Sequence, residues 1–335
     1  MKALPDGFEV SELFASLADG WGFDVEVAEY APVGAGSYHW VVADPSGTRA
    51  FVTVDDLDQK KWLGDTRESA FDGLRAALDT TVALRDASLP FVVAPIPMNH
   101  GANVLRVGAR HTVALFPFVD GRSGRFGHAD AGEQVAVASI LAELHKATPA
   151  TCSAARSVGV DLPGRTRLES SLRELDQTWV GGPLSEPARR AVAGNADDVA
   201  DVLALADRLA GVVESRGGAW VVTHGEPHAG NVMRTAESLV LVDWDTVAFA
   251  PPERDLWMLV GESGDDAANV YTDATGHRLD EDAVSFFRLT WDLKDLAEYL
   301  NLLRSPHHET EDTARAYEGL TRCVSIRDRW EPLLD

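Results

Sequence analysis

The chain has 335 residues, of which 45% are hydrophobic and 25% are charged, values that are ordinary for a globular protein. Fifty-three acidic residues against 30 basic ones give a formal net charge of −23. Such a field repels nucleic acids and anionic membranes and attracts cations, although an acidic surface more often serves only solubility. The composition therefore argues against a nucleic-acid-binding or membrane-binding protein and is compatible with a cationic small-molecule ligand.

The two cysteines, Cys152 and Cys323, form neither a disulfide framework nor a metal-binding spacing. The first residues do not resemble a signal peptide, and no apolar run approaches the length needed to cross a membrane. We therefore expect a cytoplasmic protein. No protein partner is evident from the sequence.

The first 120 residues are predicted to be rich in strands around one helix. Apolar, β-branched and aromatic residues between Gly, Pro and Asp predict strands over residues 23–30, 37–43, 50–54, 103–107 and 111–116. Phe71, Leu74, Leu78 and Val82 recur at three- and four-residue spacing, which predicts the helix.

After residue 121 the pattern becomes mostly helical. Helices are predicted over residues 130–147, 184–215, 252–262, 281–304 and 310–330. The Pro-, Ser- and Gly-rich stretch 148–166 is predicted to be a connecting loop. Residues 220–243 are the exception and predict a small β insertion.

This β insertion carries the residues that point most clearly to chemistry. Glu226 and Asn231 stand five residues apart, and Asp243 directly follows the apolar run 239–242. A carboxylate can orient and deprotonate an attacking group, and Asn and Asp supply the oxygen ligands that Mg²⁺ prefers. Singly, an Asn after Gly is more often a turn residue. In this order the three residues form the layout of a phosphoryl-transfer site.

The layout resembles the catalytic and metal-binding loops of protein kinases and, more closely, of the aminoglycoside phosphotransferases. The run at 250–256, Ala-Pro-Pro-Glu-Arg-Asp-Leu, is similar to the spectinomycin phosphotransferase branch. The resemblance implies an α+β, protein-kinase-like fold with two lobes. Residues 1–120 would form a small antiparallel-sheet lobe that ends in a hinge, and residues 121–335 a larger, mostly helical lobe.

The resemblance also implies an activity. It predicts a phosphotransferase that uses Mg²⁺ and ATP or GTP and acts on a hydroxyl of a small molecule, an aminoglycoside-like or aminocyclitol antibiotic. Three alternatives stay open at this stage. They are a pseudokinase that binds a nucleotide or ligand without turnover, a kinase of an amino sugar, sugar or choline-like metabolite, and a nucleotidyltransferase.

Several roles follow from the resemblance. Glu226 is the candidate catalytic residue and stands where the family usually has Asp. The change moves the carboxylate by roughly 1 Å, and Pro227 favours an extended backbone at Glu226 that offers compensation. Asn231 and Asp243 would hold Mg²⁺. The remaining assigned positions are Gly34, Gly36, Ser37, Thr53 and the hinge residue Phe118 for the nucleotide, and His224, Asp245 and Asp255 for structural support.

The main departure from the family lies on the third strand. Kinases and their relatives carry a Lys there, which pairs with the phosphates and with a helix Glu, whereas this chain has Thr53. Glu68 or a neighbour would be the helix acid. The cation would then come from elsewhere, and Lys60, Lys61 or Arg67 could fold back, although Lys and Arg are usually solvated surface residues.

A second acidic group is a candidate for substrate binding. Asp292, Asp295 and Glu298 follow one another at three-residue spacing in the helix predicted over residues 281–304. By resemblance, acidic helices near the C-terminus bind the ammonium groups of aminoglycosides. A solvated helix face explains the same spacing equally well. His228 is a further candidate near the acceptor.

Two other motifs are rejected. His224 and His228 flank Glu226, but the zinc-protease motif places Glu directly after the first His, and Gly225 and Pro227 oppose a helix. Residues 159–166 almost match a P-loop. No apolar strand precedes them, and Pro163 removes a backbone donor where the loop needs one.

Overall fold

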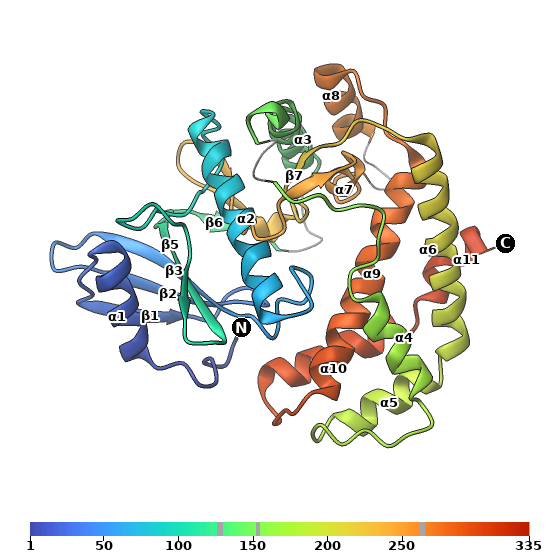
Figure 1. Ribbon diagram of the computed structural model, residues 1–335. Coiled ribbons are helices and arrows are strands. Elements are labelled where there is room, and N and C mark those ends of the chain that lie inside the picture. Colours follow the sequence, from blue (N-terminus) through green and yellow to red (C-terminus); the bar gives the residue numbers. More distant parts are fainter. Residues whose placement is uncertain (126–129, 152–154, 261–264, 335) are drawn as a thin grey trace. The chain divides into compact units, whose positions relative to one another are not determined.

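The computed structural model describes residues 1–125, 130–151, 155–260 and 265–334, and the chain divides into two compact units (Figure 1). The first unit contains residues 3–158 and 219–279, and the second contains residues 159–218 and those from 280 onward. The first unit holds an antiparallel sheet and the second is helical, which confirms the predicted α+β class. The lobe boundary at residue 120 stays a prediction.

The main sheet of the first unit is antiparallel and has the strand order β1-β2-β3-β5-β4. Its strands are β1 (Val27–Ala31), β2 (Tyr38–Ala43), β3 (Arg49–Asp56), β4 (Leu105–Val107) and β5 (His111–Pro117). All five were predicted, with shifts at the ends. The register places Thr53 of β3 opposite His39 of β2 and Ala114 of β5.

Two helices cover the two faces of this sheet (Figure 1). Helix α1 (Val10–Trp21) was not predicted; it packs Leu13 and Leu17 against the face that carries Trp40 and Val52. Helix α2 (Arg67–Asp86) packs on the face that carries Ala114. Its N-cap residue, Thr66, accepts a hydrogen bond from the Ser69 N–H, which fixes where the helix starts.

The rest of the first unit positions the segment that carries Glu226, Asn231 and Asp243. Its helices are α3 (Ala131–Lys146), α7 (Glu253–Leu256) and α8 (Asp265–Thr275), with short 3-10 turns η1 (Thr148–Ala150) and η2 (Ala229–Asn231). Strands β6 (Arg122–Ser123), β8 (Val232–Arg234) and β9 (Leu239–Leu241) form one small sheet, and β7 (Val221–Thr223) pairs with β10 (Ala248–Ala250). The predicted β insertion is confirmed. The helix predicted over 252–262 is shorter, since α7 ends at Leu256, and residues 261 and 262 lie outside the described ranges.

The second unit consists of helices in the part of it that the structure describes. They are α4 (Arg165–Arg173), α5 (Ser185–Ala193), α6 (Ala196–Arg216), α9 (Glu281–Arg304), α10 (Glu311–Cys323) and α11 (Arg327–Leu334). Helix α9 was predicted with the same bounds and packs against α4, α5, α6 and α10. A side chain at Gly319 of α10 would lie 2.6 Å from a ring carbon of Tyr299, so glycine lets α10 approach α9 closely.

No helix in the described ranges is both long enough and apolar enough to cross a membrane.

Candidate active site

The loop between β7 and β8 brings Glu226 and Asn231 together. The Asn231 side-chain Nδ2 donates to the Glu226 carbonyl at 3.0 Å, so its amide oxygen points the other way and is available as a ligand. The Asn231 carbonyl accepts from the Val242 N–H at 3.0 Å, which links the loop to the residue directly before Asp243. This bond joins residues that are eleven positions apart in sequence, so the loop and the start of the Asp243 segment meet at one place.

Asp243 follows β9 and has an unusual backbone. Its φ is +66°, in the left-handed region that non-glycine residues rarely adopt and that is often found at functional sites. Its carboxylate forms no hydrogen bond with any residue that the structure describes. Many protein atoms surround this carboxyl, and Asp245 carries a like charge nearby, so its pKa is raised. Its side chain nevertheless keeps an exposed face.

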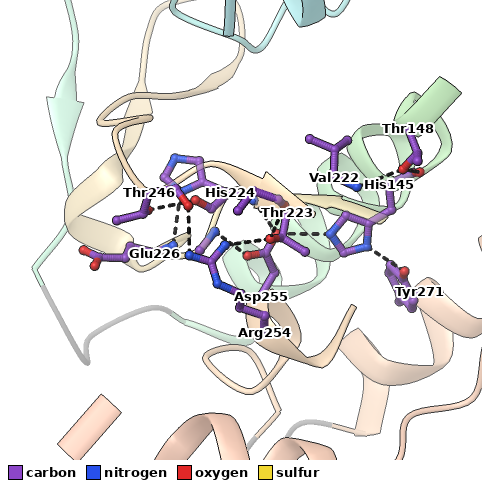
Figure 2. Close-up of polar contacts among 12 residues, drawn as sticks. His145, Thr148, Val222, Thr223, His224, Glu226, Thr246, Arg254, Asp255 and Tyr271 are labelled. Atoms are coloured by element: carbon purple, nitrogen blue, oxygen red, sulfur yellow. Dashed lines mark hydrogen bonds and ion pairs between the residues drawn. The ribbon is translucent and has the colours of Figure 1, made fainter. Parts of the chain in front are cut away.

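Asp255 of α7 holds the start of the loop between β7 and β8 (Figure 2). Its carboxylate is fully buried and accepts the backbone N–H groups of His224, at 2.8 Å, and Gly225, at 2.6 Å. His145 of α3 approaches the same carboxylate with Nε2 at 3.1 Å, and its Nδ1 lies 2.7 Å from the Tyr271 hydroxyl. Burial alone would raise the pKa of Asp255, but the hydrogen bond and charge of His145 lower it below its ordinary value. Neither His145 nor Tyr271 was expected from the sequence.

Arg254 of α7 contacts both ends of this region, at Thr223 and Thr246, and its role was also not expected from the sequence. Its guanidinium donates to the Thr223 hydroxyl at 2.7 Å and to the Thr246 carbonyl at 2.8 Å (Figure 2). Gly225 sits directly on this group. Its φ is +96°, and a side-chain carbon there would lie 2.7 Å from the Arg254 Cζ. Only glycine tolerates both the backbone angle and the contact.

Replacing Gly225 by alanine is therefore expected to destabilise the protein. The new methyl group would displace Arg254 and force a left-handed alanine, and such strain costs about 1–3 kcal/mol. Denaturant unfolding of the variant measures the loss. Gly211→Ala is the control, because a side chain at this helical position would meet no atom within 4 Å. Equal free energies of unfolding for the two variants would contradict the account.

His224 is buried in a neutral form. Its Nε2 lies 3.0 Å from the Val242 carbonyl, and its Nδ1 accepts the Glu226 N–H at 3.2 Å, so the proton resides on Nε2. Burial lowers the pKa of His224 from 6.5 to about 4. A proton on Nδ1 would remove the acceptor that holds the backbone of Glu226.

This pKa predicts that acid weakens the fold. Between pH 6.5 and 4 the unfolded state takes up the His224 proton and the folded state does not, so the free energy of unfolding falls as the pH falls, by up to about 3 kcal/mol. Unfolding experiments across this pH range test the prediction. His224→Asn, which keeps a donor and an acceptor, should show a shallower slope. An unchanged slope in this variant would contradict the assignment.

The turn before β2 contains the predicted glycines. Gly34 and Gly36 have φ values of +66° and +83°, which only glycine adopts easily. Ser37 follows them and is buried. On β3, the Thr53 hydroxyl lies 3.3 Å from Nδ1 of His39 on β2. Burial lowers the pKa of His39 to about 4. The third-strand position therefore faces a neutral imidazole and carries no cation.

Lys60 supplies a buried cation instead. The residue is 2% exposed, and its Nζ lies 2.9 Å from Asp55 Oδ1, 2.6 Å from Asp245 Oδ2 and 2.8 Å from the Ser37 hydroxyl. Burial lowers the pKa of Lys60, but Asp245 and Asp55 raise it by more, so the amine stays charged. Of the three cations considered from the sequence, Lys60 is the one that folds back. Lys61 donates to the Asp65 carbonyl.

The proposed helix acid is not the partner of this cation. Glu68 is 71% exposed and pairs with Arg106, and Arg67 pairs with Asp58 at 2.5 Å. The prediction for Glu68 was wrong because Lys60 enters from the segment after β3, where Asp55 and Asp245 lie within reach. Carboxylates from β3 and from the Asp243 loop therefore take the place of a helix Glu.

The other predicted residues have these positions. Phe118 follows β5, and the Arg49 Cζ lies 3.6 Å from the centroid of its ring. His228 is the N-cap of η2 and its carbonyl accepts the Asn231 N–H. Asp292 accepts hydrogen bonds from Arg329, at 2.6 Å, and Trp330, at 3.1 Å.

Asp295 and Glu298 lie with Asp292 on α9, in the second unit, and both are partly buried. Lys294 Nζ lies 3.9 Å from the Glu298 carboxylate. The substrate-binding role of these three acids stays a prediction. Cys152 lies outside the described residues, and Cys323 is a free thiol.

Comparison with known proteins decides the family. The model of the phosphotransferase enzyme family matches residues 32–306, which include the glycine turn, Lys60, the catalytic loop and α7. The chain belongs to this phosphotransferase family. The resemblance inferred from the sequence is thereby confirmed, and the family consists of kinases that phosphorylate hydroxyl groups of small molecules.

Individual relatives of this phosphotransferase are distant in sequence. Protein StrN of Streptomyces griseus is 28% identical over 271 residues, covering 78% of this chain and 80% of StrN. A spectinomycin phosphotransferase solved with ADP and spectinomycin has a TM-score of 0.72 at 17% identity, covering 97% of this chain and 99% of that one. An aminopropanol kinase has a TM-score of 0.63 at 15% identity, covering 97% and 98%. These likenesses confirm the kinase-like fold.

Proposed function

We propose that this phosphotransferase transfers the terminal phosphoryl group of ATP or GTP to a hydroxyl of a cationic small molecule. The observation that carries the proposal is that hydrogen bonds link the loop of Glu226 and Asn231 to the segment of Asp243. Asp255 fixes the start of this loop by accepting two of its backbone N–H groups. Glu226 would accept the proton of the attacking hydroxyl. In a loose phosphoryl-transfer transition state, positioning and charge neutralisation supply most of the catalysis.

The donor set fits a magnesium ion. Asn231 and Asp243 offer hard oxygen ligands, and no described residue competes for the Asp243 carboxylate. Burial raises the pKa of Asp243 most, and the negative charges of Asp245 and Glu226 raise it further. The same negative charges favour a bound cation. No three His, Cys, Asp or Glu side chains in the described ranges are arranged as a metal site by themselves. Bound Mg²⁺ would therefore complete its ligands from phosphate and water and would neutralise the phosphates.

The substrate class rests on charge and on relatives. The net charge of −23 favours a cationic acceptor. Proteins of the same fold are named as kinases of spectinomycin, amicoumacin and aminopropanol. We therefore propose an aminoglycoside-like or aminocyclitol antibiotic as acceptor. The aminopropanol kinase supports a second candidate, an amino alcohol of metabolism, and we expect either reaction to take place in the cytoplasm.

The mass of the product tests this function. Purified protein is incubated with Mg²⁺ and ATP or GTP and with a panel of aminoglycosides, aminocyclitols and amino alcohols. The proposal predicts that one class gains the mass of a single phosphate. A gain of one nucleotide would instead establish nucleotidyl transfer, and no product together with no bound nucleotide would establish that the protein is not a working kinase.

A further inference from the structure

The amine of Lys60 joins three segments of the first unit. Its acceptors are Ser37 from the glycine turn, Asp55 from β3 and Asp245 from the loop after β9. A lysine ammonium has three N–H donors, so these three acceptors use all of them. Two of the acceptors are carboxylates, and Ser37 is the only neutral one among the three.

We propose that a phosphate oxygen of the bound nucleotide replaces the Ser37 hydroxyl as the third acceptor of Lys60. Lys60 is then the phosphate-binding cation of this enzyme, although it comes from the segment after β3 and not from the strand itself. The proposal rests on the proposed function. It also adds a specific exchange, in which the phosphate oxygen and the Ser37 hydroxyl compete for the same N–H of Lys60.

Hydrogen-bond strength gives the direction of the exchange. An ammonium group attracts an anionic oxygen through the full opposite charge, whereas a neutral hydroxyl offers it only a dipole. Phosphate is therefore a better acceptor for Lys60 than a hydroxyl. The Ser37 hydroxyl would also keep a hydrogen-bond partner after the exchange, because it already donates to Asp55 Oδ1 at 2.7 Å. The two carboxylates stay in place and keep the lysine charged.

The place of Ser37 supports a phosphate at this position. Ser37 ends the turn of Gly34 and Gly36, whose backbone angles only glycine adopts easily. The ring of Trp62 lies close to the same turn, because a side-chain carbon added at Gly36 would be 3.3 Å from it. Lys60 Nζ lies 4.9 Å from the centroid of this ring. The amine is therefore fixed beneath the turn and within reach of an anion bound there.

Binding of ADP and adenosine to Lys60→Met tests the proposal. Calorimetric titrations are run in the absence of metal, with GDP and guanosine in parallel. We expect ADP or GDP to bind roughly 10- to 100-fold more weakly to the variant, and the nucleoside to change less than about threefold. Lys61→Met is the matched control, because Lys61 donates to the Asp65 carbonyl, which is not one of the three acceptors of Lys60. An equal loss for diphosphate and nucleoside would show that Lys60 only supports the fold and would overturn the proposal.

Ser37→Ala provides a test that does not remove the charge. This variant deletes the competing acceptor, so ADP should bind about 2- to 10-fold more tightly, with adenosine unchanged. Weaker ADP binding would overturn the exchange, and this variant decides the matter if Lys60→Met does not fold. If the wild-type protein binds neither ADP nor GDP, the proposed function itself fails, which is a different outcome.

Discussion

Replacing Glu226 by glutamine is expected to lower kcat by roughly 10²- to 10⁴-fold, the contribution that a general base typically makes. Glutamine keeps the size and one oxygen of the side chain but cannot accept a proton. The backbone of residue 226 is held by His224 and Asn231 through its N–H and carbonyl, so the loop should not rearrange. Nucleotide affinity should stay within about threefold, because the role of Glu226 concerns the acceptor hydroxyl.

Two further variants sharpen this result. Glu226→Asp introduces the residue that the family usually carries, but on a loop shaped for the longer side chain, so an intermediate loss of up to about a hundredfold is expected. Glu237→Gln, on the exposed turn before β9, is the matched control and should be neutral. A Glu226→Gln enzyme with wild-type kcat would show that another group takes the proton.

Replacing Asp255 by alanine is expected to lower the free energy of unfolding by about 3–5 kcal/mol, as for other broken buried charge networks. The change leaves the N–H groups of His224 and Gly225 and the imidazole of His145 without their acceptor in a fully buried place. Denaturant unfolding measures the stability. Turnover under native conditions should fall as well, because the same two N–H groups position the start of the catalytic loop.

Asp273→Ala is the control for this experiment, since Asp273 is an exposed residue of α8. Its free energy of unfolding should stay within about 0.5 kcal/mol of wild type. Asp255→Asn keeps one acceptor oxygen and should lie between the two. A loss in Asp255→Ala no larger than in Asp273→Ala would contradict the bracing role.

The candidate site residues that the sequence could supply are those that lie close together along the chain. Glu226, Asn231 and Asp243 lie within one short stretch, so their order and spacing could be read directly. Lys60 could only be offered as one of three cations, because its partner Asp245 lies 185 positions further along the chain. His145 was missed for the same reason, since Asp255 lies 110 positions away. Burial of a charged residue depends on such distant partners, which a local pattern does not contain.

The helices, too, were predicted correctly where the local pattern decides them and wrongly where it does not. Helix α9 was predicted with the right ends because Asp280 caps it and its apolar residues keep helical spacing. The helix predicted over residues 184–215 is instead two helices, because the chain turns at Gly194 and Asn195. Helix α4 was not predicted, and its first two residues fall in the stretch 148–166 that was predicted to be a loop. Its nine residues are mostly polar, and only packing identifies its buried side, at Leu168 and Ser171.

Calorimetric titration of ATP and GTP, with and without Mg²⁺, into wild-type protein and Asp243→Asn tests whether this chain has a magnesium-dependent nucleotide site. We expect that the wild type binds one of these nucleotides, that Mg²⁺ strengthens the binding, and that Asp243→Asn loses this strengthening while it keeps the metal-free affinity. No binding of either nucleotide would contradict the phosphotransferase site described above. A Mg²⁺ effect of the same size in the variant would contradict the assignment of Asp243 as a metal ligand.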